Sequence, residues 1–185
     1  YFGRLIDYMD EHDMWKDTCI VLSTDHGFLL GEHDMWAKVH MPWYQEMAHT
    51  PFFVWDPRSG VQSERRTCLV QPSLDLGPTL LDFFGMERDE YMLGHALGDV
   101  VAGDQPVREA ALFGHHGGQV NVTDGRYVYM RGPATETNAP LHNYTLMPTH
   151  MRSAFSPDEL KNAEFVPGFS HMRECNVLRT EAGGR

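Results

Sequence analysis

Length, composition and charge limit the classes of protein to which this sequence can belong. The chain has 185 residues, of which 42% are hydrophobic, which is enough for one packed core and argues against collagen-like or disordered chains. Its formal net charge of −11, without any basic run, argues against nucleic acid as a partner, because phosphate binding requires Lys and Arg. No apolar stretch approaches the roughly 20 residues of a membrane-spanning helix, so we expect no membrane segment in this chain.

The first predicted elements alternate between helix and strand. The chain opens with an amphipathic helical pattern, whose apolar positions are Phe2, Leu5, Ile6 and Met9. Residues 18–24 form a continuous β-favouring run of the kind found in strands buried on both faces, and residues 51–55 form a second. A helix is predicted over 73–85, with Pro78 in its first turn and Gly85 as its C-cap. This alternation indicates a layered α/β fold.

Beyond about residue 105 the pattern changes. Short runs at 110–113 and 126–130, around the turn-like 123–125, predict a small antiparallel sheet. Further on, "SPDELKNAEF" predicts a short helix with Ser156 as N-cap and Pro157 at its first position. We therefore expect residues 1–104 to belong to an α/β core and residues 105–185 to form a small C-terminal α+β subdomain and tail.

The sequence immediately after the first buried run is rich in polar residues. Asp25 and His26 follow the run and precede Gly27, and ligands of open α/β sheets bind beyond the carboxyl ends of strands. A carboxylate and an imidazole can ligate one cation if the backbone bends, which Gly27 would permit. Chemistry alone gives equal weight to another interpretation, in which Asp25 caps the following segment and His26 makes a structural hydrogen bond.

Lys38 strengthens the functional interpretation. A single lysine is usually a solvated surface amine, but an ammonium beside a cation suits the oxygens of phosphate or sulfate. The whole pattern, "DHGFLLGEHDMWAK" followed by "YQE" and an apolar strand, resembles the sulfatases of the alkaline-phosphatase superfamily, specifically their C-terminal half. The resemblance covers "DTCIVLSTDHG" through "VQPSLDLGPTLLDFFGM", about the first half of the chain, and "DGRYVYMRG" looks like the small C-terminal sheet of that family.

The resemblance implies a fold and a set of site residues. The fold would be a layered α/β/α main sheet, present in part, followed by a small antiparallel sheet with a short helix. Asp25 and His26 would be ligands of a divalent cation, usually Ca²⁺, while Lys38 would bind a sulfate oxygen and help to stabilise the nucleophile. Because imidazole is a softer ligand than Ca²⁺ prefers, Mn²⁺ and Zn²⁺ stay open on chemical grounds.

Three further histidines and three aromatic residues are candidates for the site. His33 belongs to the pattern, and we favour a structural or ligand-orienting role for it over direct catalysis. His115 and His116, in the glycine-flanked "FGHHGGQ", could reach substrate, although exposed loop histidines more often have no such role. Trp36, Trp43 and Tyr44 could line an entrance for a sugar or aryl group, but we expect them to belong to the core.

The chain lacks parts that the family needs. In sulfatases the nucleophile is a formylglycine made from C/S-x-P-x-R, and an Asp-Asp pair supplies two further metal ligands; neither motif occurs here. We therefore expect a C-terminal portion that is inactive alone, with the N-terminal part of the same enzyme as partner and a sulfate ester as substrate. Three alternatives remain: a phosphonate monoester hydrolase or phosphodiesterase of the same superfamily, a non-catalytic relative, and an α/β binding module.

Overall fold

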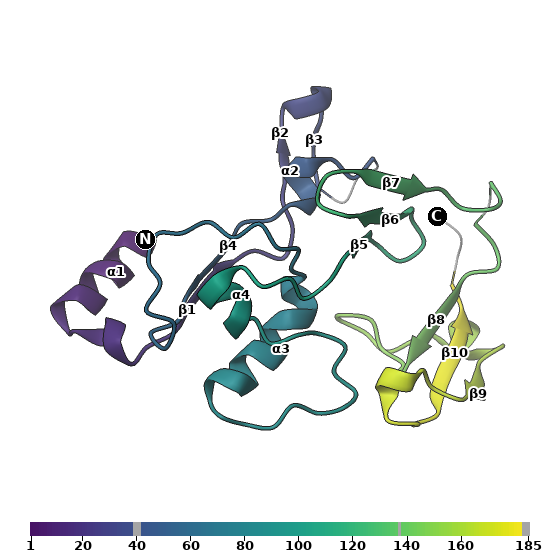
Figure 1. Ribbon diagram of the computed structural model, residues 1–185. Helices are drawn as coiled ribbons and strands as arrows, with labels where there is room; N and C mark the ends of the chain where they lie inside the picture. The colour runs from purple at the N-terminus through teal and green to yellow at the C-terminus, as the bar shows by residue number, and fades with distance from the viewer. Residues whose placement is uncertain (39–41, 137, 183–185) are drawn as a thin grey trace.

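The structure, a computed structural model, describes residues 1–38, 42–136 and 138–182. Helices combine with small antiparallel sheets, so the predicted α/β class is confirmed (Figure 1). The elements of the first part are α1 Phe2–Glu11, β1 Ile20–Ser23, β2 Leu29–Leu30, β3 Trp36–Ala37, α2 Gln45–Ala48, β4 Phe52–Trp55, α3 Pro72–Phe83 and α4 Gly98–Gly103. The later elements are β5 Ala111–Gly114, β6 Val120–Thr123, β7 Val128–Arg131, β8 His142–Thr145, α5 Pro157–Leu160, β9 Glu164–Val166 and β10 Val177–Glu181.

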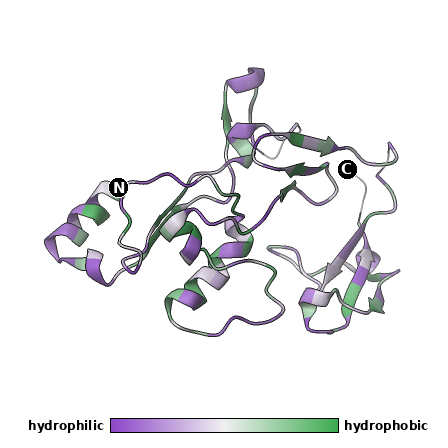
Figure 2. Ribbon diagram, viewed as in Figure 1, coloured by the Kyte–Doolittle hydropathy of each residue, from purple (hydrophilic) through white to green (hydrophobic). Residues whose placement is uncertain are grey.

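The predicted N-terminal helix is confirmed as α1. Hydrophobic and hydrophilic residues alternate around it (Figure 2), as expected for a helix with one apolar face. Met9 is buried, but Phe2 and Leu5 on the same face stay 42% and 48% exposed. The apolar face of α1 is therefore only partly covered by the described residues.

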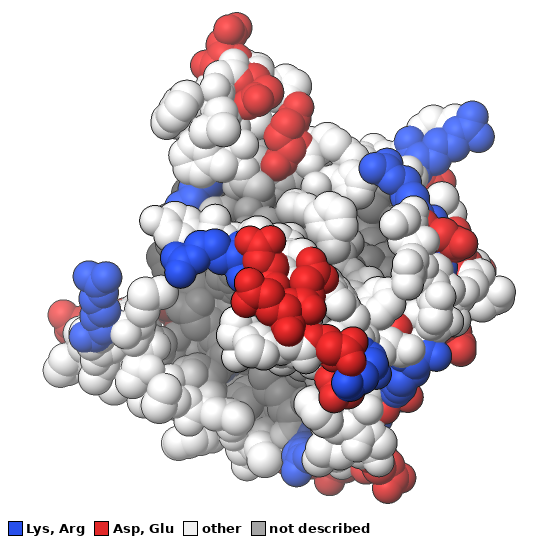
Figure 3. Space-filling model, turned by 90° about the vertical axis from the view of Figure 1, so that its left-hand side faces the viewer, with Lys and Arg blue, Asp and Glu red and all other residues white. Residues whose placement is uncertain are grey.

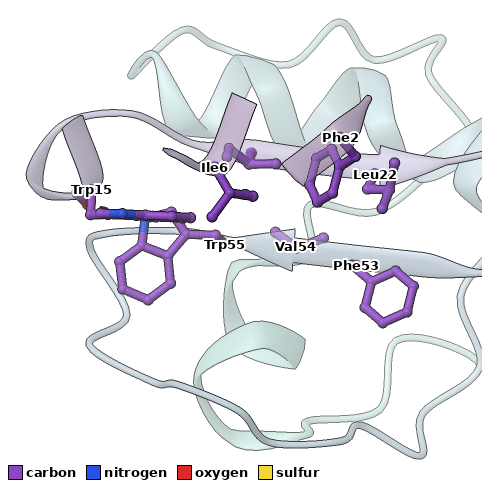
Figure 4. Close-up of a pocket in the computed structure, with 8 residues that line it drawn as sticks. Phe2, Ile6, Trp15, Leu22, Phe53, Val54 and Trp55 are labelled. Carbon is purple, nitrogen blue, oxygen red and sulfur yellow. Dashed lines mark hydrogen bonds between the residues drawn. The ribbon is translucent and has the colours of Figure 1, made fainter. Parts of the chain in front are cut away.

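The strands β1 and β4 pair with each other as an antiparallel two-stranded sheet, in register from Ile20 opposite Trp55 to Ser23 opposite Phe52. The prediction that both strands are buried on both faces is wrong for the described residues, because Leu22 is 37% and Phe53 63% exposed. An apolar groove of about 380 Å³ runs between α1 and this sheet (Figure 4).

The helix predicted over 73–85 is confirmed as α3, with a correction at its start. Pro72 takes the first helical position, whereas Pro78 lies in the helix interior rather than in the first turn. Pro78 has no N–H to donate to the carbonyl of Leu74, and the backbone of Gly94 approaches that carbonyl instead. Gly85, with φ +66°, follows the helix and donates its N–H to Asp82 O at 3.0 Å, which confirms its predicted role in ending the helix.

The C-terminal region contains two three-stranded antiparallel sheets, ordered β5-β6-β7 and β8-β10-β9. The sequence predicted the first sheet but not β6, its central strand. The predicted short helix is confirmed as α5: Ser156 Oγ accepts from the N–H of Glu159, whose carboxylate in turn accepts from Ser156 N–H. The boundary predicted at residue 104 lies between α4 and β5 and stays a prediction.

Within residues 1–38, 42–136 and 138–182, no helix is both long enough and apolar enough to cross a membrane.

Candidate metal and anion site

Asp25 and His26 lie two and three residues beyond the end of β1, as predicted. The carboxylate Oδ1 of Asp25 accepts the backbone N–H of His26 at 3.1 Å and the hydroxyl of Thr24 at 3.3 Å. These bonds engage Oδ1, whereas the second oxygen, Oδ2, accepts no hydrogen bond from the described residues. Both bonds are local to residues 24–26 and involve only Oδ1, one of the two carboxylate oxygens.

The imidazole of His26 is held in one tautomer by its own backbone. Its Nδ1 lies 2.8 Å from the carbonyl oxygen of Gly27, and because a carbonyl only accepts, the ring proton lies on Nδ1. In the neutral ring Nε2 then carries a lone pair. Histidines that bind metal through one ring nitrogen usually donate a hydrogen bond from the other, often to a backbone carbonyl.

The two free donor atoms converge. His26 Nε2 lies 3.5 Å from Asp25 Oδ2, close to the roughly 3 to 3.5 Å expected between neighbouring ligand atoms that share one cation. When His26 is charged it attracts Asp25, and together with local hydrogen bonds this holds the pKa of the Asp25 carboxyl below its ordinary value. The pair fits two positions of a coordination shell. Within the described residues, no group of three or more His, Cys, Asp or Glu could hold a metal ion.

Gly27 is required here for a different reason from the one predicted from sequence. Its φ is not positive, so the bend alone does not demand glycine. Its N–H instead donates to Met47 O at 3.0 Å, and a Cβ at this position would overlap the carbonyl oxygen of Glu46 and lie 2.9 Å from Met47 Cα. The glycine lets the loop that carries Asp25 and His26 pack directly against α2.

Lys38 stands at the base of the β2–β3 hairpin. Leu29 pairs with Ala37, so Lys38, the next residue, lies at the same end of the hairpin as the loop of Asp25 and His26. Its side chain is exposed and makes no hydrogen bond or ion pair with any described residue. Among the described residues, Lys38 is thus an exposed ammonium without a charged partner, at the base of the hairpin.

His33 connects the tip of this hairpin to α2. It has φ 56°, its ring stacks on Tyr44 with 3.6 Å between centroids, and its Nε2 lies 3.3 Å from Glu46 Oε2. These contacts join the hairpin to α2, and the structural or ligand-orienting role of His33 stays a prediction. Glu46 is the residue whose contact with His33 was missed, although the "YQE" spacing within the motif was a signal for it.

His115 and His116 have separate environments. His115 packs edge-on against Trp43 with 5.2 Å between ring centroids, while His116 Nε2 lies 3.0 Å from the carbonyl oxygen of His142. Trp43 belongs to a core cluster with Leu29 and Met47, so His115 lies beside the elements that carry the site. Neither histidine contacts Asp25, His26 or Lys38 among the described residues, and their substrate role stays a prediction.

The three aromatic residues assigned to the core have different outcomes. Trp43 is 8% exposed and Tyr44 half-buried against the core cluster, as predicted. Trp36 is 73% exposed, so its core assignment is wrong. Trp36 lies in the two-residue strand β3, whose hairpin projects from the molecule, and its ring lies edge-on to that of Phe28.

Acidic side chains are exposed on the projecting hairpin and along α1. The projecting hairpin carries exposed Glu32 and Asp34 at its tip, where acidic side chains are seen (Figure 3). Acidic residues are also exposed along α1, at Asp7, Asp10 and Glu11. Lys38 is therefore a local cation on a largely acidic part of the molecule.

Comparison with known proteins identifies the family of this region. Residues 1–86 match the Sulfatase family model. The chain is 30% identical over 118 residues to the N-acetylglucosamine-6-O-sulfatase of Bacteroides thetaiotaomicron, covering 62% of this chain and 21% of that protein. It is 29% identical over 133 residues to the Delta 4,5-hexuronate-2-O-sulfatase of the same organism, covering 70% and 26%.

A solved structure also resembles this chain in its fold. The solved structure of the phosphonate monoester hydrolase SpPMH from Silicibacter pomeroyi matches with a TM-score of 0.58 and 26% identity, over 71% of this chain and 29% of that one. These matches confirm the resemblance of residues 1–86 to the sulfatases of the alkaline-phosphatase-like superfamily that the motif indicated. The chain spans about a fifth to a quarter of the length of the two curated relatives.

Proposed function

We propose that this chain supplies part of the active site of an enzyme that hydrolyses sulfate monoesters. Asp25 and His26 would hold a divalent cation, and Lys38 would bind an oxygen of the ester group. The observation that carries the proposal is the convergence of Asp25 Oδ2 and His26 Nε2 at 3.5 Å, with the proton of the imidazole directed away to Gly27. The match of residues 1–86 to the Sulfatase family model supports the reaction class.

Each residue has a distinct task in this proposal. The bound cation, Ca²⁺ by family resemblance with Mn²⁺ or Zn²⁺ as alternatives, would polarise the ester oxygens. Asp25 balances part of the charge of the cation, and His26 donates the lone pair of Nε2. Lys38, fixed at the hairpin base, donates hydrogen bonds to an oxygen on which negative charge accumulates during transfer.

The remaining parts of the site would come from a partner. Neither C/S-x-P-x-R nor an Asp-Asp pair occurs in the 185 residues. We therefore propose an N-terminal part of the same enzyme that provides a formylglycine nucleophile and the other acidic ligands. This chain without it would be inactive.

The metal ligands can be tested by cation binding in the enzyme that contains both parts. After chelation, titration with Ca²⁺, Mn²⁺ and Zn²⁺ should show binding that weakens at least about tenfold in Asp25→Asn and in His26→Gln, because each removes one ligand atom. Asp34→Asn, an exposed acid at the hairpin tip, should bind as the parent does. Parent-like affinity in both site variants would refute the assignment.

Lys38 can be tested by the kinetics of the same enzyme on 4-nitrophenyl sulfate. Lys38→Ala should lower kcat/KM by about 10² to 10³, the usual effect of losing one charge-stabilising donor. Lys16→Ala, which removes an exposed lysine paired with Asp13, is the matched control and should leave kcat/KM unchanged. Unchanged activity in Lys38→Ala would exclude it from the site.

A second candidate is hydrolysis of phosphonate monoesters. The structural match to a phosphonate monoester hydrolase favours it, because that enzyme shares the fold of most of this chain. A preference for a phenylphosphonate ester over 4-nitrophenyl sulfate in kcat/KM would decide for this alternative. Activity on neither ester, with no cation bound, would favour a non-catalytic relative or a binding module.

A further inference from the structure

The apolar groove between α1 and the sheet β1-β4 is open to solvent in the part of the chain that the structure describes. The described residues that line it are all apolar, and Phe2, Leu22 and Phe53 among them are exposed. Large apolar side chains that gather at one exposed place usually mark a surface on which another protein segment packs. The groove is therefore a candidate docking surface.

The shape of the groove indicates what kind of element fits it. Ile20 pairs with Trp55 and Leu22 with Phe53, so these four side chains project to one face of the sheet and form its floor. The helix α1 forms one wall. The rings of Trp15 and Trp55 meet edge-on at one end of the groove, with 5.6 Å between their centroids (Figure 4). Because the groove lies over a sheet face and not along a strand edge, it suits a second helix beside α1.

The rim that α1 gives to the groove is acidic. Asp10 follows Ile6 by one helical turn and accepts the indole N–H of Trp15 at 2.7 Å, so its carboxylate lies beside the groove. Asp7, one turn before Asp10, is exposed as well, and acidic side chains gather on the face of the molecule that α1 occupies (Figure 3). A helix that enters the groove with its apolar face would therefore gain from Lys or Arg along the edge that meets α1.

The same charges distinguish between two possible occupants. In a two-fold dimer across the groove the same surface would meet itself, so the acidic rims of two copies would face and repel each other. Further chain of the same enzyme carries no such penalty, and the segments matched here cover only 21% and 26% of the two curated relatives.

We propose that the groove receives an amphipathic helix from the N-terminal part of the same enzyme, with Lys or Arg on the edge that faces α1. The existence of that part rests on the proposed function. The groove itself involves neither Asp25 and His26 nor Lys38, so the two proposals can fail separately.

Calorimetric titration of the 185-residue chain with two synthetic peptides at constant ionic strength tests the chemistry of the groove. Both peptides have about 18 residues, enough to form a helix, with leucines on one face and either Lys or Glu on the other. The Lys peptide should bind at least about tenfold more tightly than the Glu peptide. Asp7→Asn combined with Asp10→Asn should reduce this difference.

A matched pair of variants locates the peptide. Phe53→Gln should weaken binding of the Lys peptide about tenfold or more, because an apolar side chain leaves the interface. Leu112→Gln should bind as the parent does, because Leu112 is exposed to the same extent as Phe53, 63%, but lies on β5. Parent-like binding in Phe53→Gln, or equal binding of the two peptides, would overturn the proposal.

The same titration on the enzyme that contains both parts identifies the occupant. The groove should then be filled, so the Lys peptide should bind at least about tenfold more weakly than it binds the 185-residue chain. Equal binding would show that the N-terminal part leaves the groove open. A dimer of the 185-residue chain in light scattering that Phe53→Gln dissociates would instead assign the groove to a second copy.

Two further results separate this proposal from the proposed hydrolysis. Asp25→Asn should bind the Lys peptide as the parent does, so a failed cation titration with intact peptide selectivity would refute the metal site alone. Absence of peptide binding to the folded 185-residue chain, with folding checked by circular dichroism, would refute the groove alone.

Discussion

Gly27→Ala is expected to destabilise the chain by about 3 kcal/mol, the upper end of the usual cost of overpacking, because the added Cβ would overlap a backbone carbonyl that cannot move without displacing α2. The atoms involved are the carbonyl oxygen of Glu46 and the Cα of Met47. The relevant measurement is the free energy of unfolding from urea titration. Because Gly27 also fixes the loop of Asp25 and His26 against α2, cation binding in the complete enzyme should weaken in parallel.

The matched control is Gly3→Ala, in α1, where a new Cβ meets nothing within 4 Å. Replacing a helical glycine by alanine should stabilise by about 0.5 to 1 kcal/mol. The two substitutions add the same methyl group, so a difference in sign isolates the close approach at Gly27. A near-neutral effect of Gly27→Ala would mean that the loop is free to move away from α2.

Asp75→Asn should lower the free energy of unfolding by a comparable amount, because it removes a buried negative charge. Asp75 is fully buried and accepts from both terminal nitrogens of Arg108 at 2.6 Å, while the backbone N–H groups of Gln71 and His95 also donate to it. Removing the negative charge leaves the guanidinium of Arg108, itself only 10% exposed, without its partner. Such a change typically costs about 3 to 5 kcal/mol.

The effect of Asp75→Asn should depend on pH. Burial opposes ionisation of Asp75, but the hydrogen bonds from Arg108 and the two N–H groups outweigh it, so the pKa of the carboxyl lies below its ordinary value. The stability that the charge contributes is therefore complete above the unfolded pKa of about 3.9 and is lost as pH falls through the lower folded pKa.

Urea unfolding of parent and variant at pH 7 and near pH 3 tests this dependence, with Asp7→Asn as the control. Asp7 is exposed on α1, so its substitution should change stability by less than about 0.5 kcal/mol. A constant difference between Asp75→Asn and the parent over the whole pH range would contradict the charge-based explanation. A difference no larger than that of Asp7→Asn would show that the pair is not needed for stability.

The buried pair of Asp75 and Arg108 also affects the segment that leads to His115 and His116. Arg108 lies just before β5, and Gln71, next to the start of α3, donates its side-chain amide to Leu112 O at 2.8 Å. These contacts attach β5 to α3, and β5 leads directly into the loop of His115 and His116. Asp75 therefore holds the segment through which that loop is presented.

The sequence by itself determined the features that depend on neighbouring residues. The apolar spacing of α1 and the Ser156–Glu159 capping box of α5 act within one or two helical turns, and both elements form as predicted. The position of Asp25 and His26 just after a strand was also readable, because an apolar run followed by polar residues marks a strand end. The motif around Lys38 identified the family for the same reason: its residues are close together in the chain.

Only the tertiary structure decided the features that depend on distant contacts. The demand for glycine at position 27 comes from α2, about twenty residues later, and the partner of Asp75 lies 33 residues away. The tautomer of His26 and the exposure of Phe53 were equally unreadable. Local propensities fix backbone conformation over a few residues, whereas burial and side-chain pairing depend on which segments pack together.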